Sequence, residues 1–128
     1  MRELAAGFRS HLIETEGHAQ KVEGLLQQLT GSADTETCKV IHALVTEAED
    51  MIKDAENSQV LDVSLIAAGQ QVEHHEIAVY GTLRTWAELL GRTTDAAVLE
   101  SILEEEKNAD MVLSTAADKL NVEADVAA

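Results

Sequence analysis

Apolar residues recur at helical spacing along four segments of the chain, residues ~2–29, ~36–56, ~59–90 and ~93–120. In each segment Leu, Val, Ile or Ala returns every three or four positions, which is typical of a helix with one buried face. Because the connections are short, the pattern predicts an all-α bundle of three long helices and one shorter helix. We assign residues 1–120 to this bundle and expect residues 121–128 to form a frayed tail.

Glycine and short polar residues mark the predicted helix ends. Gly31 and Gly91 follow the first and third segments, and a glycine at such a position commonly stops a helix. Asp34 or Thr35 is a candidate cap for the second helix. Close helix packing is the expected reason for four glycines inside the predicted helices, Gly17, Gly24, Gly69 and Gly81.

The third segment interrupts its apolar stripe once, within residues 72–79. Helical spacing places His75 and Glu76 in the missing turn. Glu73 lies three residues before Glu76, and Tyr80 lies four residues after it, so these side chains share one face at the edge of the core.

The first segment carries a similar interruption. Its stripe passes from His18 to Glu14 or Thr15 and then to His11. Glu14 and His18 are four residues apart and therefore point the same way.

In the last segment Glu105 or Glu106 interrupts the stripe, and Asp110 lies four residues after Glu106. All three interruptions fall near the middle of their segments. In an antiparallel bundle they would meet in one layer.

Several carboxylates in one buried layer cannot all be ionised without a cation, because burial and mutual repulsion would protonate some of them. A pair of divalent metal ions bridged by carboxylates, with imidazole as a terminal ligand, resolves this conflict. Iron or manganese fits Glu with His, whereas zinc more often recruits fewer carboxylates.

Simpler interpretations stand beside the metal site for some of these residues. His74 lies off the stripe and reads as a surface or hydrogen-bonding residue, whereas His75 is open between core packing and support of a site. His11 and His42 read as ordinary surface histidines. The acidic run 104–106 is also compatible with a solvated face.

Composition narrows the class of protein further. The chain has 128 residues, no proline and a formal net charge of -15, which disfavours binding to nucleic acid or to an anionic membrane. Cys38 is the single cysteine, so no intramolecular disulfide is available, as is usual in a reducing compartment. No apolar run is long enough to cross a bilayer, and we expect a cytoplasmic protein.

Together with these residues, longer stretches resemble a known family. FRSHLIETEGHAQKVEGLL, CKVIHALVTEAEDMI, DVSLIAAGQQVEHHEIAVYGTLRTWAELLG and AAVLESILEEEKNADMVLSTAADKLN are similar to the ferritin-like bacterial stress proteins called YciE/YciF, or DUF892. QVEHHEIAVYGT followed by LEEEKNAD is the specific part of the match. The resemblance implies a ferritin-like bundle in which the short helix is a crossover segment.

The resemblance also implies a set of metal ligands. Four carboxylate positions of the ferritin-like pattern match Glu14, Glu73, Glu76 and Glu105 or Glu106. His18 takes the imidazole position, where this family often has Gln, and Asp110 lies near the place of a second His. His75 and Tyr80 would support the ligands.

The chain departs from the family pattern in one respect, since the family has a further helix, with a Glu ligand, ahead of FRSHLIET. We therefore expect an exposed apolar groove on the bundle and a homodimer that buries it.

Two functions follow as hypotheses. The first is a di-metal protein of iron or manganese, linked to stress response, that reacts with oxygen or peroxide. The second is a non-catalytic, dimerising helical stress protein with a degenerate metal site.

Overall fold

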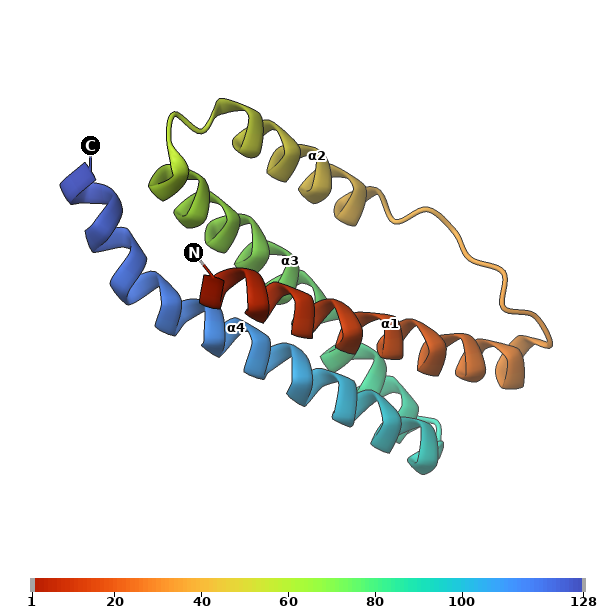
Figure 1. The fold of residues 1–128 in the computed structure, drawn as a ribbon. Helices are drawn as coiled ribbons and strands as arrows, with labels where there is room; N and C mark the ends of the chain where they lie inside the picture. Colours follow the sequence, from red (N-terminus) through yellow and green to blue (C-terminus); the bar gives the residue numbers. More distant parts are fainter. Residues whose placement is uncertain (1, 128) are drawn as a thin grey trace.

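The computed structural model describes residues 2–127, which form helices and connecting segments without a β-strand in that range (Figure 1). The helices are α1 (Arg2–Thr30), α2 (Lys39–Asp54), α3 (Ser58–Leu89) and α4 (Thr93–Ala127). The predicted all-α architecture, with three long helices and one shorter helix, is confirmed.

The chain direction of the helices explains why α2 is needed. α1 and α3 run the same way, and α4 runs opposite to both (Figure 1). A chain that places two successive long helices in parallel has to travel back between them. The segment 31–38 and α2 make this return, and α2 packs along α3 in the opposite direction (Figure 1). The predicted ferritin-like bundle with a crossover helix is confirmed, with α4 antiparallel to α1 and α3.

Most of the predicted helix ends are close to those observed. Gly31 and Gly91 have positive φ angles of 76° and 72° and follow the ends of α1 and α3. The cap prediction for α2 was wrong, because this helix begins after Cys38 rather than after Asp34 or Thr35. A side-chain cap is present at the start of α3, where the Asn57 side chain accepts a 2.8 Å hydrogen bond from the Val60 backbone N–H.

The last helix is longer than predicted and continues to Ala127. Residues 121–127, NVEADVA, contain no glycine or proline, so nothing in the covalent chain stops the helix after Leu120.

The apolar core lies in two parts. One part contains Leu4, Ile66, Leu113 and Leu120, and the other contains Ala87, Ala96 and Leu99. Near the first part, a Cβ on Gly69 would lie 3.0 Å from Leu113 Cδ1, so the close-packing prediction applies there. It was wrong for the other three predicted glycines, Gly17, Gly24 and Gly81, where an added Cβ would meet nothing within 4 Å.

α2 covers α3 along its N-terminal half and leaves the other half without cover on that side (Figure 1). As a result Trp86 is 57% exposed, and Leu89 and Leu90 are exposed as well. No helix in the described part of the chain combines the length and the apolar character needed to span a membrane.

Candidate metal centre

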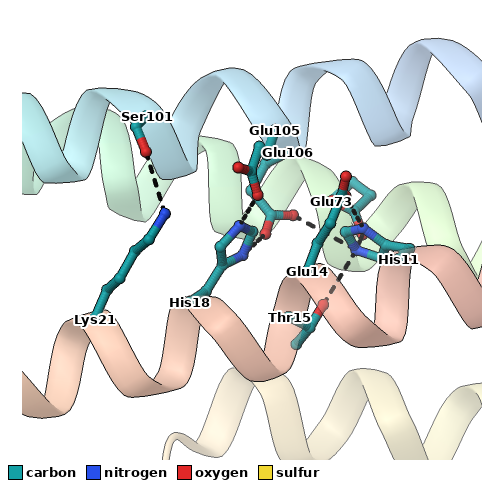
Figure 2. A network of polar contacts seen from close by, with 9 residues as sticks. All are labelled: His11, Glu14, Thr15, His18, Lys21, Glu73, Ser101, Glu105 and Glu106. Carbon is teal, nitrogen blue, oxygen red and sulfur yellow. Dashed lines mark hydrogen bonds and ion pairs between the residues drawn. The ribbon is translucent and has the colours of Figure 1, made fainter.

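A layer of imidazole and carboxylate side chains lies between the two parts of the core (Figure 2). His11 and His18 come from α1, Glu73 from α3, and Glu105 and Glu106 from α4. The two histidines are seven residues apart, which is about two helical turns, so both rings leave the same face of α1. The layer thus joins all three long helices.

His11 lies at one end of the layer. Its Nε2 is 2.7 Å from Glu73 Oε1 and 3.8 Å from Glu106 Oε2, and its Nδ1 is 3.3 Å from Glu14 Oε2. His11, Glu73 and Glu106 each offer a ligand atom within 4.8 Å of the others. Three such donors from three helices form a group that can hold one metal ion.

His18 lies at the other end, next to the same Glu106. Its Nδ1 is 2.7 Å from Glu106 Oε1, and its Nε2 is 2.7 Å from Glu105 Oε2. His18 is 3% exposed and Glu106 is fully buried. Glu106 is therefore the carboxylate common to both histidines, in the position of a bridge between two ligand groups.

The charges in this layer are strongly perturbed. Burial, with the neighbouring carboxylates of Glu73 and Glu76, raises the pKa of Glu106 to about 11. The hydrogen bond to Glu73 raises the pKa of His11 to about 9, against the opposing effect of burial. At neutral pH the metal-free layer therefore holds a proton on Glu106 and a second charge-balancing proton on His11.

The pKa of Glu73 is lowered in spite of its burial. The nearby His11 imidazole and the carboxyl group of Glu106 both stabilise its ionised form. Glu73 is thus a buried carboxylate beside a cationic ring, whereas Glu106, one helix away, is a neutral acid.

Several buried atoms of the layer have no hydrogen-bond donor or acceptor with proper geometry among the described residues. They are His18 Nδ1, Glu73 Oε2, Glu106 Oε1 and Glu106 Oε2. The 2.7 Å approach of His18 Nδ1 to Glu106 lacks hydrogen-bond geometry, although the distance is short. Buried polar atoms are almost always paired in proteins, and converging unpaired N and O donors fit a bound cation. The residues present therefore fit a metal ion.

Two further side chains line this layer. Glu76 is partly buried, and its carboxylate is one of the neighbours that raise the pKa of Glu106. The Tyr80 ring meets the His18 ring edge-on, with centroids 6.3 Å apart. Burial, with the charges of Glu76 and Glu106, raises the pKa of Tyr80 to about 12, so its hydroxyl keeps its proton.

The remaining residues predicted for the site lie elsewhere. Asp110 is not in the layer but pairs with His74 Nε2 at 3.2 Å and accepts a 3.3 Å hydrogen bond from Gln70. His75 points toward the start of α2, where its Nε2 is 4.0 Å from Cys38 Sγ. His75 is next to Glu76 on α3, so it is turned about 100° around the helix from that residue. Asp110 lies one helical turn beyond Glu106, about 6 Å farther along α4, where it pairs with His74.

His11 is the residue that the sequence interpretation missed. It was expected to be a surface histidine, but its side chain is 21% exposed and contacts three carboxylates. The signal was the interval of seven residues to His18 and of three residues to Glu14, which places all three on one helix face. His42, by contrast, is exposed on α2 as expected.

The fold and the layer define a class of protein, a helical bundle with a carboxylate–histidine centre and a crossover helix. Residues 1–126 match the family described as "Domain of unknown function (DUF892)", and the chain belongs to this family. The predicted family resemblance is therefore confirmed.

Individual relatives agree with this assignment. Protein YciF of Escherichia coli (strain K12) is 39% identical over 112 residues, which are 87% of this chain and 68% of that protein. The crystal structure of the E. coli stress protein YciF has a TM-score of 0.86 and 38% identity, over 92% of this chain and 75% of that one. YcfI from Rhodopseudomonas palustris also has a TM-score of 0.86, with 36% identity over 90% and 73%.

Proposed function

We propose that this protein binds two divalent metal ions, iron or manganese, in the layer between α1, α3 and α4, and that it acts in a stress response. The observation that carries the proposal is the set of buried, unpaired donor atoms that converge on Glu106 from three helices. Bound there as Fe(II) or Mn(II), the ions would supply electrons to oxygen or to a peroxide.

Each side chain has a role in this proposal. His11 and Glu73 would hold one ion, His18 and Glu105 would hold the other, and Glu106 lies within reach of both groups. Glu14 and Glu76 contact this set from α1 and α3 and supply further carboxylate oxygens.

Two residues support the set rather than belong to it. The hydroxyl of Thr15 lies 3.4 Å from His11 Nε2 and helps to fix that ring. Protonated Tyr80 offers a hydrogen-bond donor beside His18. The mixed set of oxygen and imidazole ligands suits iron or manganese better than a softer metal.

The preference for a metal centre over a degenerate polar layer rests on burial. A layer without a ligand would leave a neutral Glu106 and several unpaired oxygens in the core, at a cost of about 1–3 kcal/mol for each unsatisfied group. An apolar side chain would fill the same space without that cost. The layer is therefore better explained by a cation than by packing.

Metal stoichiometry in protein stripped with a chelator and dialysed against Fe(II) or Mn(II) without oxygen tests the proposal. We expect close to two ions per chain in the wild type. The variants His11→Ala and His18→Ala should each lose at least one ion, because each removes the imidazole of one group.

His42→Ala is the matched control, since His42 is an exposed histidine on α2 and outside the layer. It should bind as the wild type does. A wild type that takes up no stoichiometric metal, or a His42→Ala loss equal to that of His11→Ala, would contradict the proposal.

We also propose that the protein is a homodimer, works in the cytoplasm and does not bind nucleic acid. The dimer is supported by the exposed apolar side chains of α3, Val79, Trp86, Leu89 and Leu90, each of which would gain roughly 1.5–3 kcal/mol on full burial. The single exposed Cys38 is in keeping with a reducing compartment, and the net charge of -15 opposes contact with phosphates.

A further inference from the structure

α1 is attached to the α3–α4 pair by few buried side chains. Within α1 only Leu4 and His18 are buried, whereas the buried residues of α4 are spread from one end of that helix to the other. Leu12, Ile13 and Leu29 of α1 are exposed although they are apolar. α3 and α4 lie along each other and are joined by a short connection, while α1 approaches α4 over a much shorter stretch (Figure 1). The attachment of α1 is therefore weaker than that between α3 and α4.

Three glycines also make α1 a weak helix in itself. Gly7, Gly17 and Gly24 lie inside it, and a Cβ at any of the three would meet nothing within 4 Å. Close packing therefore does not require glycine there, and each of these residues favours the helix less than alanine would. A helix with low intrinsic stability and few buried residues opens locally more readily than its neighbours.

The apolar contacts of α1 lie toward its two ends. Leu4 and Phe8 pack with the first part of the core, and Leu25 packs with the second part. Between these contacts α1 presents His11 and His18 to the carboxylates of α3 and α4 (Figure 2). The middle of α1 is thus held by the polar layer rather than by the core.

This layer holds α1 differently with and without metal. In metal-free protein His18 Nδ1, Glu73 Oε2 and both carboxyl oxygens of Glu106 are buried without a hydrogen-bond partner among the described residues. Burying such atoms costs free energy, and water that enters when α1 opens would pair with them. Metal ions would bind to them instead, with imidazoles from α1 and carboxylates from α3 and α4, and would tie the three helices together.

We propose that metal binding controls the docking of α1: this helix is fixed on the α3–α4 pair when the layer holds its ions, and it opens locally in metal-free protein. The inference rests on the metal site proposed above and adds a conformational response to it. Because the ligands are divided between α1 and the α3–α4 pair, the ions bind the docked form preferentially. An ion at about 100 times its Kd would favour that form by up to about a hundredfold.

Hydrogen exchange read by mass spectrometry tests the proposal on the wild type, once with a chelator and once loaded with Mn(II) without oxygen. Residues 8–22 report on α1, and residues 98–104 report on the buried part of α4. In metal-free protein we expect the α1 amides to exchange at least about tenfold faster than those of α4. Mn(II) should slow the α1 amides by about tenfold to a hundredfold.

Two outcomes would overturn this inference alone. One is metal-free protein in which α1 is protected as strongly as α4. The other is stoichiometric uptake of Mn(II) with unchanged exchange in α1, which would leave the metal site standing. Protein that takes up no Mn(II) would overturn the metal site and the inference together, so the two failures are distinguishable.

The chain offers a matched pair of glycine variants. Gly24→Ala strengthens α1, and Gly81→Ala makes the same change on α3 at a position that is equally open. In metal-free protein Gly24→Ala should slow exchange in α1 by about fivefold, whereas Gly81→Ala should leave it unchanged. Equal slowing by both variants would show that α1 opens only when the whole protein unfolds, and would overturn the proposal.

Histidine variants test the link to the metal. His18→Ala removes one of the two imidazoles that α1 supplies, so most of the slowing by Mn(II) should be lost from α1. His42→Ala removes an exposed histidine of α2 and should keep the full effect. If His18→Ala fails to fold, His11→Ala removes the other imidazole and should give the same loss. Full slowing by Mn(II) in a folded variant of either histidine would overturn the proposal.

Discussion

Glu106 makes the stability of the metal-free protein depend on pH in a direction that can be calculated. Its pKa is raised from 4.5 to about 11 because it is fully buried among carboxylates. Between these two values the folded chain holds a proton that the unfolded chain has released. The folded state therefore binds more protons, and its free energy of unfolding falls as the pH rises.

The size of the effect follows from one proton. The slope is about 1.4 kcal/mol per pH unit, so Glu106 alone should cost about 3 kcal/mol between pH 5.5 and pH 8. His11 acts in the same direction. Its pKa is raised from 6.5 to about 9, so the stability it contributes is complete below 6.5 and is lost as the pH rises through 9. Glu73, with a lowered pKa, contributes a change only below its ordinary value of 4.5, outside this window.

Glu106→Gln isolates the contribution of Glu106 because it keeps the shape of the side chain and removes the ionisation. Urea unfolding of both proteins, with a chelator present, gives the free energies of unfolding. We expect the advantage of Glu106→Gln over the wild type to grow by about 3 kcal/mol from pH 5.5 to pH 8, a large share of the roughly 5–15 kcal/mol by which an ordinary domain is stable.

Glu104→Gln is the control for this experiment. Glu104 lies in the same acidic run, is exposed, and has its pKa lowered by Lys107, so its ionisation does not change in this window. Its difference from the wild type should be the same at both pH values. A constant difference for Glu106→Gln as well, or a wild type that becomes more stable toward pH 8 without metal, would refute the assignment of Glu106 as a neutral buried acid.

Two smaller predictions concern packing and assembly. Gly69→Ala should destabilise the protein by about 1–3 kcal/mol in thermal melts, because the new Cβ would lie 3.0 Å from Leu113 Cδ1. Gly81→Ala should stabilise it by up to about 1 kcal/mol in the same measurement, because its Cβ would meet nothing within 4 Å and Ala favours the helix over Gly. Trp86→Glu should convert a dimer to a monomer in sedimentation at micromolar concentration, and an unchanged mass would place the dimer interface elsewhere.

The sequence predicted the helices well because their signals are local. Gly31 and Gly91 end helices through their own backbone conformation, and the apolar stripes follow from the helical repeat. The start of α2 was missed because Asp34 and Thr35 have the chemistry of a cap, but the chain from Gly31 to Cys38 is used to span the return between parallel helices. The length of chain needed for this return depends on how the helices are arranged in the whole fold, so no local sequence signal predicts it.

The sequence predicted at which height along the bundle the polar layer lies, but it did not fix which polar residues meet there. A gap in an apolar stripe gives the depth of a polar residue, and His18, Glu73 and Glu106 were found in this way. It does not give the angle at which neighbouring helices meet, which decides between residues one position apart. For this reason both Glu105 and Glu106 remained candidates, and Asp110 was placed in the layer although it pairs with His74 on the flank of α3 and α4.

The two neighbours Glu105 and Glu106 show how one layer can combine stability with binding. Glu106 is fully buried and holds a proton, whereas the Glu105 side chain is 39% exposed and contacts the outer nitrogen of His18. In the metal-free protein the proton on Glu106 and the positive charge on His11 reduce the negative charge of the layer. A divalent cation would replace both protons, because its ligands bind as carboxylate and neutral imidazole. The metal-free chain therefore keeps the ligand atoms in place by holding protons on Glu106 and His11, and this makes its stability fall as the pH rises. A bound cation would remove the need for these protons.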